Sequence, residues 1–351
     1  MSPPPPEFAV TALTASPAHE FVTVIGAGAM GTCCAKLLAE NGQTVRLLTR
    51  DEGQARELSD RRENRRLLPG VSIPESILIS HDPLTATAGA DRLLIAVPTK
   101  YLRDYLSQLA PQIQSQLMPR TPAISVVKGI EFGSFRRPSE IIRETLGDRP
   151  VTALGGPCHA EEAANRLPAS VVAASDTPGD AEAVQALMNS DRFRVYTNED
   201  LIGVELAGAL KNVIAVAAGI CDGLGLGDNS KSALITRGAA EIARFGAAFG
   251  ADLATFAGLA GIGDLITSCV SGHGRNRAVG ERLGRGEPAS AVTGDLLQVA
   301  EGVNTVRSVL PLAEEKRIRM PVCREVHAVL FEGKPAADTV DALMTRPPGG
   351  E

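Results

Sequence analysis

Short apolar runs, separated by helical or loop segments, mark the first half of the chain. Residues 21–25 suit a buried parallel strand, and the Gly-rich segment 26–31 separates them from a helical stretch over 32–41. Gly42 stops that helix, and residues 44–49 form the next strand-like run, so this region predicts a βαβ unit. Further strand-like runs cover 92–97, 123–127, 151–154, 170–174 and 194–196. This order predicts a doubly wound α/β sheet.

The pattern changes near Asn198. From Asp200 onward the sequence has helical periodicity and Gly-rich breaks but no convincing strand. Apolar residues recur at intervals of three and four on one helix face, at Leu206, Leu210, Val213, Ile214 and Ala217. The sequence therefore predicts a sheet domain over 21–198 and an all-helical C-terminal domain over 199–345. The Pro-rich residues 1–20 and the residues 346–351 are expected to be tails.

Composition narrows the classes of protein that this chain can represent. Hydrophobic residues make up 44% and charged residues 22%, which is typical of a globular protein, and 351 residues suit two domains. The net charge of -6 argues against nucleic acid or an anionic membrane as partner. The sequence contains no run of 18 or more apolar residues, so no membrane span is expected. The N-terminus lacks the basic and then apolar segments of a signal peptide. The six cysteines form no C-x-x-C pair, so we expect free thiols and a cytoplasmic location.

The segment Gly26-Ala27-Gly28-Ala29-Met30-Gly31 fits the G-x-G-x-x-G pattern of a dinucleotide-binding turn. It follows an apolar strand and opens a helix, which is the context that this motif requires; an ordinary βα turn is the alternative. The first Gly permits the tight turn, the second lets a pyrophosphate approach, and the third lets helix and strand pack closely. We therefore expect a Rossmann-like sheet that binds NAD or NADP at the helix N-terminus.

The end of the second strand predicts which cofactor is preferred. An acidic residue there commonly binds the ribose 2′-hydroxyl of NAD, whereas an Arg accommodates the 2′-phosphate of NADP. The strand ends at Thr49-Arg50, and Asp51 follows. We expect Arg50 to face the ribose and Asp51 to face solvent, so that both cofactors are accepted with some preference for NADPH. The alternative is that both residues are solvated and belong to an ordinary turn.

Lys211 lies in the middle of an apolar helical stretch, with small residues one turn away at Ala207, Gly208 and Ala215. Such neighbours leave room for another molecule near the ammonium. A partly desolvated Lys has a lowered pKa and can transfer protons. The alternative, a Lys that extends along an exposed stripe, is about equally compatible with the spacing.

Several Gly-rich segments carry polar residues that could meet a phosphorylated ligand. Arg275 and Asn276 follow Gly274 at the start of a helix, and the planar guanidinium of Arg can bind two phosphate oxygens. Asp264 could orient a Lys or a substrate hydroxyl; the alternative is that it caps the following helix. Lys128-Gly129 and Gly155-Gly156-Pro157 end two strands, where ligands of doubly wound sheets bind. His159 and His273 have no metal-ligand spacing, so no metal site is expected.

Taken together, these segments resemble the bacterial-type NAD(P)-dependent glycerol-3-phosphate dehydrogenase family. The resemblance covers about residues 21 to 335 and also includes the segments 97–98, 193–196, 202–206, 210–215, 233–238, 261–265, 275–277 and 301–302. It implies reversible reduction of dihydroxyacetone phosphate to sn-glycerol 3-phosphate, the precursor of glycerophospholipids.

The resemblance also implies roles for individual residues. Lys211 becomes the general acid/base, and Lys128 and Asp264 hold the reacting groups. The remaining implied contacts are Gly156, Cys158, Gly274, Arg275 and Asn276 for the substrate, and Gly26, Gly28, Ala29, Met30, Gly31, Arg50, Lys128, Ala160, Arg275, Val299 and Glu301 for the cofactor. Ala160 is implied on the nicotinamide side, and Val299 and Glu301 near the adenine end. Met30 stands where the family has an aromatic residue, Cys158 where Thr or Ser is frequent, and Gly274 where Ser is usual.

Two other functions compete with this interpretation. One is a related dehydrogenase with the same two-domain plan that acts on a hydroxy acid or a hydroxyacyl thioester. The other is a non-catalytic NAD(P) sensor, which would tolerate the loss of Lys211. The sequence leaves the oligomeric state open, with a homodimer as one possibility.

Overall fold

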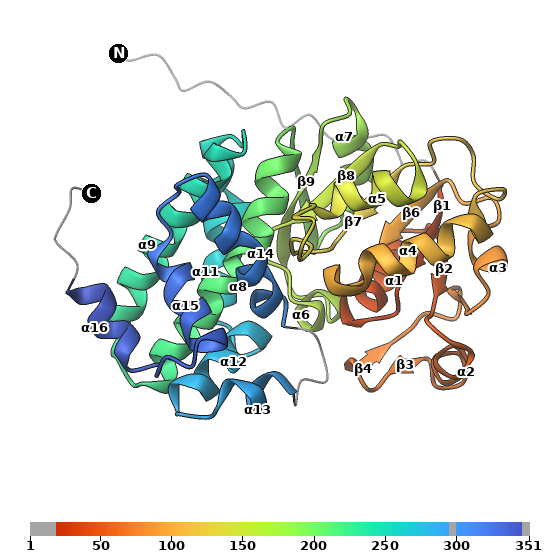
Figure 1. Cartoon of the computed structure of the whole chain (residues 1–351). Coiled ribbons are helices and arrows are strands. Elements are labelled where there is room, and N and C mark those ends of the chain that lie inside the picture. Colours follow the sequence, from red (N-terminus) through yellow and green to blue (C-terminus); the bar gives the residue numbers. More distant parts are fainter. Residues whose placement is uncertain (1–18, 295–299, 346–351) are drawn as a thin grey trace, which may run out of the picture.

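The computed structural model describes residues 19–294 and 300–345, which form two domains side by side (Figure 1). The first is built on an eight-stranded sheet in the order β10-β9-β8-β7-β6-β1-β2-β5. Every pair of neighbours is parallel except β8 and β9, which are antiparallel. The strands are β1 (Phe21–Ile25), β2 (Thr44–Leu48), β5 (Leu78–Ser80), β6 (Arg92–Ile95), β7 (Ala123–Ser125), β8 (Val151–Gly155), β9 (Ala169–Ser175) and β10 (Phe193–Asn198). The predicted doubly wound, Rossmann-like sheet is confirmed.

Helices cover both faces of this sheet because its strands bury side chains on both sides. On one face, Val22 and Val24 pack with residues of α1 (Ala29–Glu40), α6 (Ala160–Ala164) and α7 (Asp180–Met188). On the other face, Ile25 packs with α3 (Pro83–Thr87), α4 (Thr99–Ile113) and α5 (Pro138–Leu146). The two-sided burial explains why these strands are near-continuous apolar runs in the sequence.

All seven predicted strands are present, but the sequence did not reveal three short ones. β5 has three residues at the edge of the sheet, and none of them is fully buried. The strands β3 (Glu63–Asn64) and β4 (Leu68–Ser72) pair as a separate antiparallel hairpin after α2 (Glu52–Arg61). β3 has only two residues, β5 lies at the sheet edge, and β4 contains Pro69 and Gly70, which are typical of loops.

The second domain is helical throughout its described residues, as predicted, and is arranged around α8 (Leu201–Gly223). Around it lie α9 (Gly227–Ala248), α10 (Leu253–Ala257), the π-helix η1 (Leu259–Gly263), α11 (Asp264–Val270), α12 (Arg275–Gly284), α13 (Ala289–Gly294), α14 (Glu301–Glu315), α15 (Pro321–Phe331) and α16 (Asp338–Met344). α8 is long and apolar enough to cross a membrane, but 94% of its most apolar stretch is buried within the protein. Its apolar character is therefore accounted for by its place in the core.

The close approach of α8 and α12 brings two candidate site segments together. A Cβ added at Gly219 of α8 would lie 1.9 Å from the carbonyl oxygen of Arg277, so only Gly permits this crossing. As a result the N-terminus of α12, with Arg275, lies near the middle of α8, with Lys211.

The predicted N-terminal tail is two residues too long. His19 hydrogen-bonds the carbonyl oxygen of Gly42 and the Thr44 hydroxyl, and Glu20 forms an ion pair with Arg92 at 2.9 Å. These polar contacts attach the residues before β1 to the sheet, which an apolar pattern does not reveal. The predicted tails over 1–18 and 346–351 lie outside the described residues.

Candidate active site

A cleft of about 680 Å³ brings together polar residues of both domains. The Rossmann domain contributes the glycine turn and the segments that follow β2, β6, β7 and β8, and the helical domain contributes α8, α11, α12 and the start of α14. The predicted site residues among its lining are Gly26, Gly28, Ala29, Met30, Arg50, Lys128, Cys158, Lys211, Asp264, Gly274, Arg275, Asn276 and Glu301.

The glycine turn opens α1 toward this cleft. Gly28 is the N-cap of α1, and a Cβ placed there would meet no atom within 4 Å, so a ligand can approach its backbone. A Cβ at Gly31 would lie 1.9 Å from the carbonyl oxygen of Gly26, which accounts for the third glycine. Unpaired backbone N–H groups at a helix N-terminus attract anions. The turn therefore fits a pyrophosphate.

Two side chains that the sequence analysis missed hold this turn in place. The amides of Gln54 and Asn64 both donate to the carbonyl oxygen of Ala27, at 3.2 and 3.1 Å. Asn64 also donates to the Thr32 hydroxyl at 2.9 Å. Asn64 comes from the β3–β4 hairpin, whose short strands gave no signal in the sequence.

Lys211, Asp264 and Lys128 form one buried charged cluster. The Lys211 Nζ donates to Asp264 Oδ1 at 2.6 Å and to the Ser268 hydroxyl at 2.6 Å. The Lys128 Nζ donates to the other carboxylate oxygen, Oδ2, at 2.8 Å and to the carbonyl oxygen of Gly156 at 2.9 Å. Lys211 is 7% exposed and Asp264 1%. One carboxylate therefore fixes two ammonium groups from different domains.

Burial and charge act in opposite directions on this cluster. Burial lowers the pKa of the Lys211 ammonium to about 8, the Asp264 charge opposes this change, and the Lys128 charge adds to it. Burial alone would raise the pKa of the Asp264 carboxyl, but the charges of Lys128 and Lys211 hold it below its ordinary value. Lys211 can therefore exchange a proton near neutral pH while Asp264 stays ionised.

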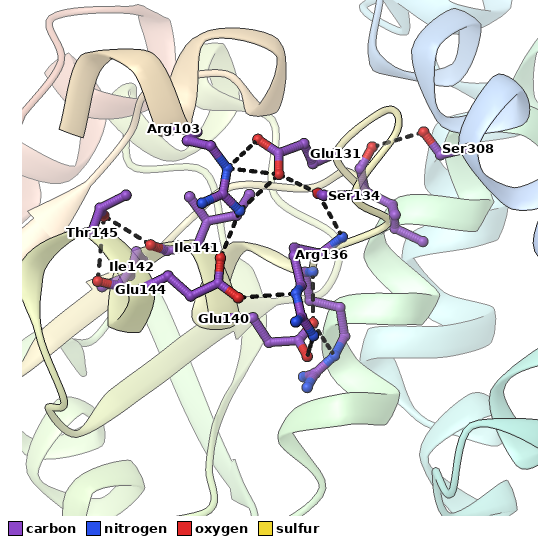
Figure 2. A network of polar contacts seen from close by, with 12 residues as sticks. Arg103, Glu131, Ser134, Arg136, Glu140, Ile141, Ile142, Glu144, Thr145 and Ser308 are labelled. Atoms are coloured by element: carbon purple, nitrogen blue, oxygen red, sulfur yellow. Dashed lines mark hydrogen bonds and ion pairs between the residues drawn. The ribbon is translucent and has the colours of Figure 1, made fainter. Parts of the chain in front are cut away.

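The loop after Lys128 is held by a polar network that joins the two domains (Figure 2). Arg103 of α4 donates to Glu131 at 2.9 Å and to Glu144 of α5 at 2.7 Å. The Ser308 hydroxyl of α14 donates to the carbonyl oxygen of Ile130 at 3.1 Å. Asn212, next to Lys211 on α8, donates to the carbonyl oxygen of Lys128 at 3.3 Å. These contacts determine where the Lys128 backbone lies.

Gly156 and Cys158 lie on the loop that follows β8. Gly156 has a φ of +108°, and its carbonyl oxygen accepts from Lys128. The Cys158 thiol is half-buried at the cleft, and burial raises its pKa to about 11. Ala160 is 5% exposed and packs in the Rossmann core, one residue behind His159.

Arg275 and Asn276 are the first residues of α12, with Gly274 as N-cap. Asn276 is fixed on both sides: its Nδ2 donates to Asn212 Oδ1 at 2.9 Å, and its Oδ1 accepts from the Gly302 N–H at 3.0 Å. Arg275 lines the cleft beside it.

Glu301, the first residue of α14, connects α14 to the Rossmann domain. Its Oε1 accepts from the Thr99 N–H at 3.0 Å, and burial raises the pKa of its carboxyl to about 7. Thr99 follows β6, whereas Arg50 follows β2, two strands away in the sheet. This contact attaches the start of α14 to the segment after β6, and the implied place of Glu301 near the adenine end stays a prediction. Val299 lies outside the described residues.

Arg50 and Asp51 lie at the opposite end of the cleft and both line it. The Arg50 Nε donates to Asp51 Oδ2 at 2.9 Å, and the two side chains are 77% and 47% exposed. Asp51 also caps α2 by accepting from the Gln54 N–H at 2.8 Å. The Asp51 side chain is thus exposed, as expected, and its role as helix cap holds it beside Arg50.

Ser268 is a third residue that the sequence analysis missed. It lies four residues after Asp264 on the same helix, α11, so both side chains point to one face. That spacing could have identified it once Asp264 was a candidate. Together Asp264 and Ser268 hold the Lys211 ammonium from one side.

Comparison with known proteins identifies one family for both domains. The chain matches models of the NAD-dependent glycerol-3-phosphate dehydrogenase N-terminus over residues 21–181 and C-terminus over 200–341. It is 46% identical to glycerol-3-phosphate dehydrogenase [NAD(P)+] of Prosthecochloris aestuarii, over 94% of this chain and 99% of the relative. The corresponding protein of Geobacillus thermodenitrificans is also 46% identical, over 93% and 95%.

A solved structure extends the likeness to the arrangement of both domains. The crystal structure of glycerol-3-phosphate dehydrogenase from Coxiella burnetii superposes with a TM-score of 0.88 at 34% identity, and covers 93% of this chain and 99% of that one. The family models and these relatives span both domains, including the segments that carry Lys128, Lys211 and Asp264. The chain therefore belongs to the NAD-dependent glycerol-3-phosphate dehydrogenase family.

Proposed function

We propose that this protein reversibly reduces dihydroxyacetone phosphate to sn-glycerol 3-phosphate with NADH or NADPH. The observation that carries the proposal is the buried Lys211 ammonium, held by Asp264 and Ser268 in the cleft between the two domains. Reduction of a ketone needs a proton donor for the developing alkoxide, and a positioned ammonium both donates the proton and stabilises the charge.

In this mechanism Lys211 donates its proton to the C2 oxygen of the substrate, and a bound reduced nicotinamide would supply the hydride. In the reverse reaction the neutral amine accepts the proton from the hydroxyl. Asp264 holds the ammonium in position, and Lys128 places a second positive charge next to the same carboxylate. The two charges favour the alkoxide-like transition state over the neutral ketone.

The residues at the other side of the cleft fit a dinucleotide. The open backbone at Gly28 and the N-terminus of α1 accept the pyrophosphate, with Ala29 and Met30 beside it. Arg50 follows β2, where an Arg can accommodate the 2′-phosphate of NADP in such sheets, so we expect both cofactors to be accepted. Glu301 accepts from the Thr99 N–H after β6, and Lys128 lies after β7.

Arg275 supplies the main grip on the substrate phosphate in this proposal. It is the first residue of α12, so its guanidinium and the backbone N–H groups of the helix N-terminus face the cleft together. Binding of this remote group orients the carbonyl toward Lys211. Cys158, Gly274 and Asn276 complete the walls of the substrate pocket, and Gly156 contributes through its carbonyl oxygen, which accepts from Lys128.

A single assay tests the proposal: loss of NADH or NADPH absorbance when dihydroxyacetone phosphate is added to the purified protein. We expect turnover that depends on the substrate phosphate. Turnover of 3-hydroxy acids or hydroxyacyl thioesters instead would support the related dehydrogenase, and cofactor binding without turnover would support a sensor.

We also propose the division near residue 198 as the domain boundary, a cytoplasmic location and glycerophospholipid supply as the role of the product. The sheet ends at Asn198 and α8 begins at Leu201, which supports the boundary. All six cysteines are free, which agrees with a reducing compartment. A homodimer remains a proposal that sedimentation velocity would test.

A further inference from the structure

A buried carboxylate on α8 joins the helical domain to the start of α5, outside the cleft lining. Glu205 is 4% exposed, and its Oε2 accepts from Arg137 Nη1 and from the Ser139 hydroxyl, both at 2.6 Å. Its Oε1 accepts from the Ser139 N–H at 2.7 Å. Burial raises the pKa of the Glu205 carboxyl, and the Arg137 charge and the Ser139 hydrogen bonds oppose this change. A buried ion pair is weak evidence for stability, but it can fix one arrangement of the groups that it joins.

Glu205 belongs to a stripe of α8 that meets both ends of the β7–α5 loop, residues 126–137. Glu205 holds the far end of the loop. Gly208 lies one turn later on the same face, and a Cβ there would lie 3.5 Å from Lys128 Cγ, so the Lys128 side chain lies against the helix backbone. Asn212, one turn further, donates to the carbonyl oxygen of Lys128 at 3.3 Å. The loop therefore begins and ends on one face of α8.

The middle of the loop is braced, so its two ends are not independent. The Glu131 N–H donates to the carbonyl oxygen of Arg136 at 3.0 Å, and the Phe135 N–H donates to that of Glu131 at 3.0 Å. The side chains of Glu131 and Arg136 belong to the network in Figure 2. Ile130 is 3% exposed and packs in the core of the helical domain. A displacement at α5 is therefore transmitted to the start of the loop.

Three side chains of the helical domain hold this loop by hydrogen bonds, and they differ in strength. Asn212 and Ser308 each donate to a backbone carbonyl oxygen, at 3.3 and 3.1 Å. Glu205 forms a charged contact at 2.6 Å, and charge-assisted hydrogen bonds are roughly twice as strong as neutral ones. The Glu205 contact is therefore the main attachment of the loop end to α8.

We propose that Glu205 is a positioning residue, which acts through the β7–α5 loop to keep the Lys128 ammonium on Asp264. This inference rests on the proposed function, in which Lys128 supplies a second positive charge next to the reacting ketone. The Lys128 side chain is 20% exposed, so water could hydrate its ammonium if the loop moved. Its contact with Asp264 then depends on where the Lys128 backbone is held.

The test variant is Glu205→Gln, which keeps the shape of the side chain and removes its charge. Arg137 retains Glu140 at 3.3 Å as a partner, so the variant should fold, and thermal melting verifies this. The Lys128 charge lowers the pKa of Lys211. If Lys128 moves away, the pH at which kcat for reduction falls should rise by about one pH unit. Misplacement should also lower kcat/KM about tenfold or more.

The direction of this movement separates positioning from simple loss of charge. Removal of a negative charge, taken alone, lowers the pKa of a lysine, so it would move the fall of kcat to lower pH. Besides Lys128, the titratable groups that act on Lys211 or respond to its charge lie on α11 and on the segment between β8 and α6. They are Asp264, Cys269, Cys158 and His159. Glu205→Gln changes none of them.

A second measurement needs no turnover. Competitive labelling with acetic anhydride over a range of pH, read by mass spectrometry, follows the titration of the Lys211 amine itself, which lines the cleft. We expect the labelling midpoint of Lys211 to rise in Glu205→Gln and in Lys128→Met. The double variant should rise no further than Lys128→Met, because both changes remove the same interaction. If wild type labels in this way but does not turn over dihydroxyacetone phosphate, only the proposed function fails.

The matched control is Glu241→Gln, the same substitution at a carboxylate that is 2% exposed. Glu241 accepts from the Val322 and Cys323 N–H groups at the start of α15, outside the cleft lining. Its loss should leave the Lys211 midpoint unchanged. Should Glu205→Gln fail to fold, Ser139→Ala replaces it, since it removes one hydrogen bond and leaves the ion pair, and the same upward movement is expected.

Three results would overturn the inference. One is a Lys211 midpoint that stays in place or moves to lower pH in Glu205→Gln, or in Ser139→Ala where that variant replaces it. Another is a double variant whose midpoint rises by the sum of the two single changes, since additive effects mean independent routes. The third is an equal rise in Glu241→Gln, which would show that any loosened helix end produces the effect.

Discussion

The two ends of the cleft each contain a close ion pair, yet the pairs differ in their surroundings. Lys211 and Asp264 are 2.6 Å apart, with side chains that are 9% and 2% exposed. Arg50 and Asp51 are 2.9 Å apart, with side chains that are 77% and 47% exposed. Nearly equal distances therefore join charges in two very different dielectric environments.

The difference teaches that distance alone does not measure what a pair contributes. Water screens the exposed pair, and such pairs typically contribute less than about 1 kcal/mol. A buried pair loses its hydration, so each partner depends on the other and removal of one is costly. Burial also changes the chemistry, because it lowers the pKa of Lys211 to about 8. The proposed catalytic end should therefore be sensitive to single substitutions and the adenosine end tolerant of them.

The largest effect should come from the buried ammonium itself. Lys211→Met keeps the length of the side chain and removes the proton donor, so kcat should fall by about 10²-fold or more while cofactor affinity changes little. Steady-state kinetics and a cofactor titration measure the two quantities. Lys316→Met, at an exposed lysine of the helical domain, is the control. A Lys211→Met enzyme with wild-type kcat would refute the proposed role.

The next effect should come from the carboxylate that holds both lysines. Asp264→Asn leaves the buried Lys211 ammonium and the partly buried Lys128 ammonium without their counter-charge, so the free energy of unfolding should fall by about 3 kcal/mol. Denaturant titration measures this loss. Asp222, which accepts from Lys231 at 2.8 Å and from Arg277 at 2.6 Å, also holds two cations but is partly exposed. Asp222→Asn should therefore cost less.

The Asp264→Asn variant should also change how kcat depends on pH. Reduction needs the protonated Lys211, so its kcat should be high below the pKa of about 8 and fall as the pH rises through it. Because the Asp264 charge raises the pKa of Lys211, its removal should move this fall to lower pH. Oxidation, which needs the neutral amine, should show the opposite dependence. An unmoved pH profile in Asp264→Asn would assign the titration to another group.

The same contrast explains what the sequence could and could not predict. The seven predicted strands were recognisable because they contain apolar runs, and nearly every residue of β1, β6, β7 and β8 is buried. The site residues were recognisable as a set from the family resemblance, but their contacts were not: Lys211 and Asp264 are 53 residues apart and meet only because α11 packs on α8. The spacing of residues around Lys211 did not predict whether its side chain lies in the cleft or at the surface. Its 7% exposure decides between them.

Arg275 should give an intermediate effect, because it lies at the cleft opening and meets a charged group. Arg275→Ala should lower kcat/KM for dihydroxyacetone phosphate, and the loss of transition-state stabilisation should be about 2 to 4 kcal/mol. Unphosphorylated dihydroxyacetone should be much less affected. Arg285, the C-cap of α12, has a side chain that is 63% exposed, and Arg285→Ala is the control. Equal losses of kcat/KM for both substrates would show that Arg275 does not contact the substrate phosphate.

The smallest effect should come from Arg50. Its guanidinium is 77% exposed and already paired with Asp51, so a contact with the 2′-phosphate of NADPH must compete with water and with that carboxylate. Arg50→Ala should therefore raise KM for NADPH by about fivefold, which corresponds to about 1 kcal/mol, and leave KM for NADH almost unchanged. Arg56, 74% exposed and paired with Glu52 on α2, is a matched control because it lies outside the cleft lining. If Arg50→Ala leaves the ratio of the two KM values where wild type has it, Arg50 is only a surface residue and selectivity lies elsewhere. If instead the NADPH value rises a hundredfold, the exposed end of the cleft must close around the cofactor, and the contrast between the two ends holds only for the free enzyme.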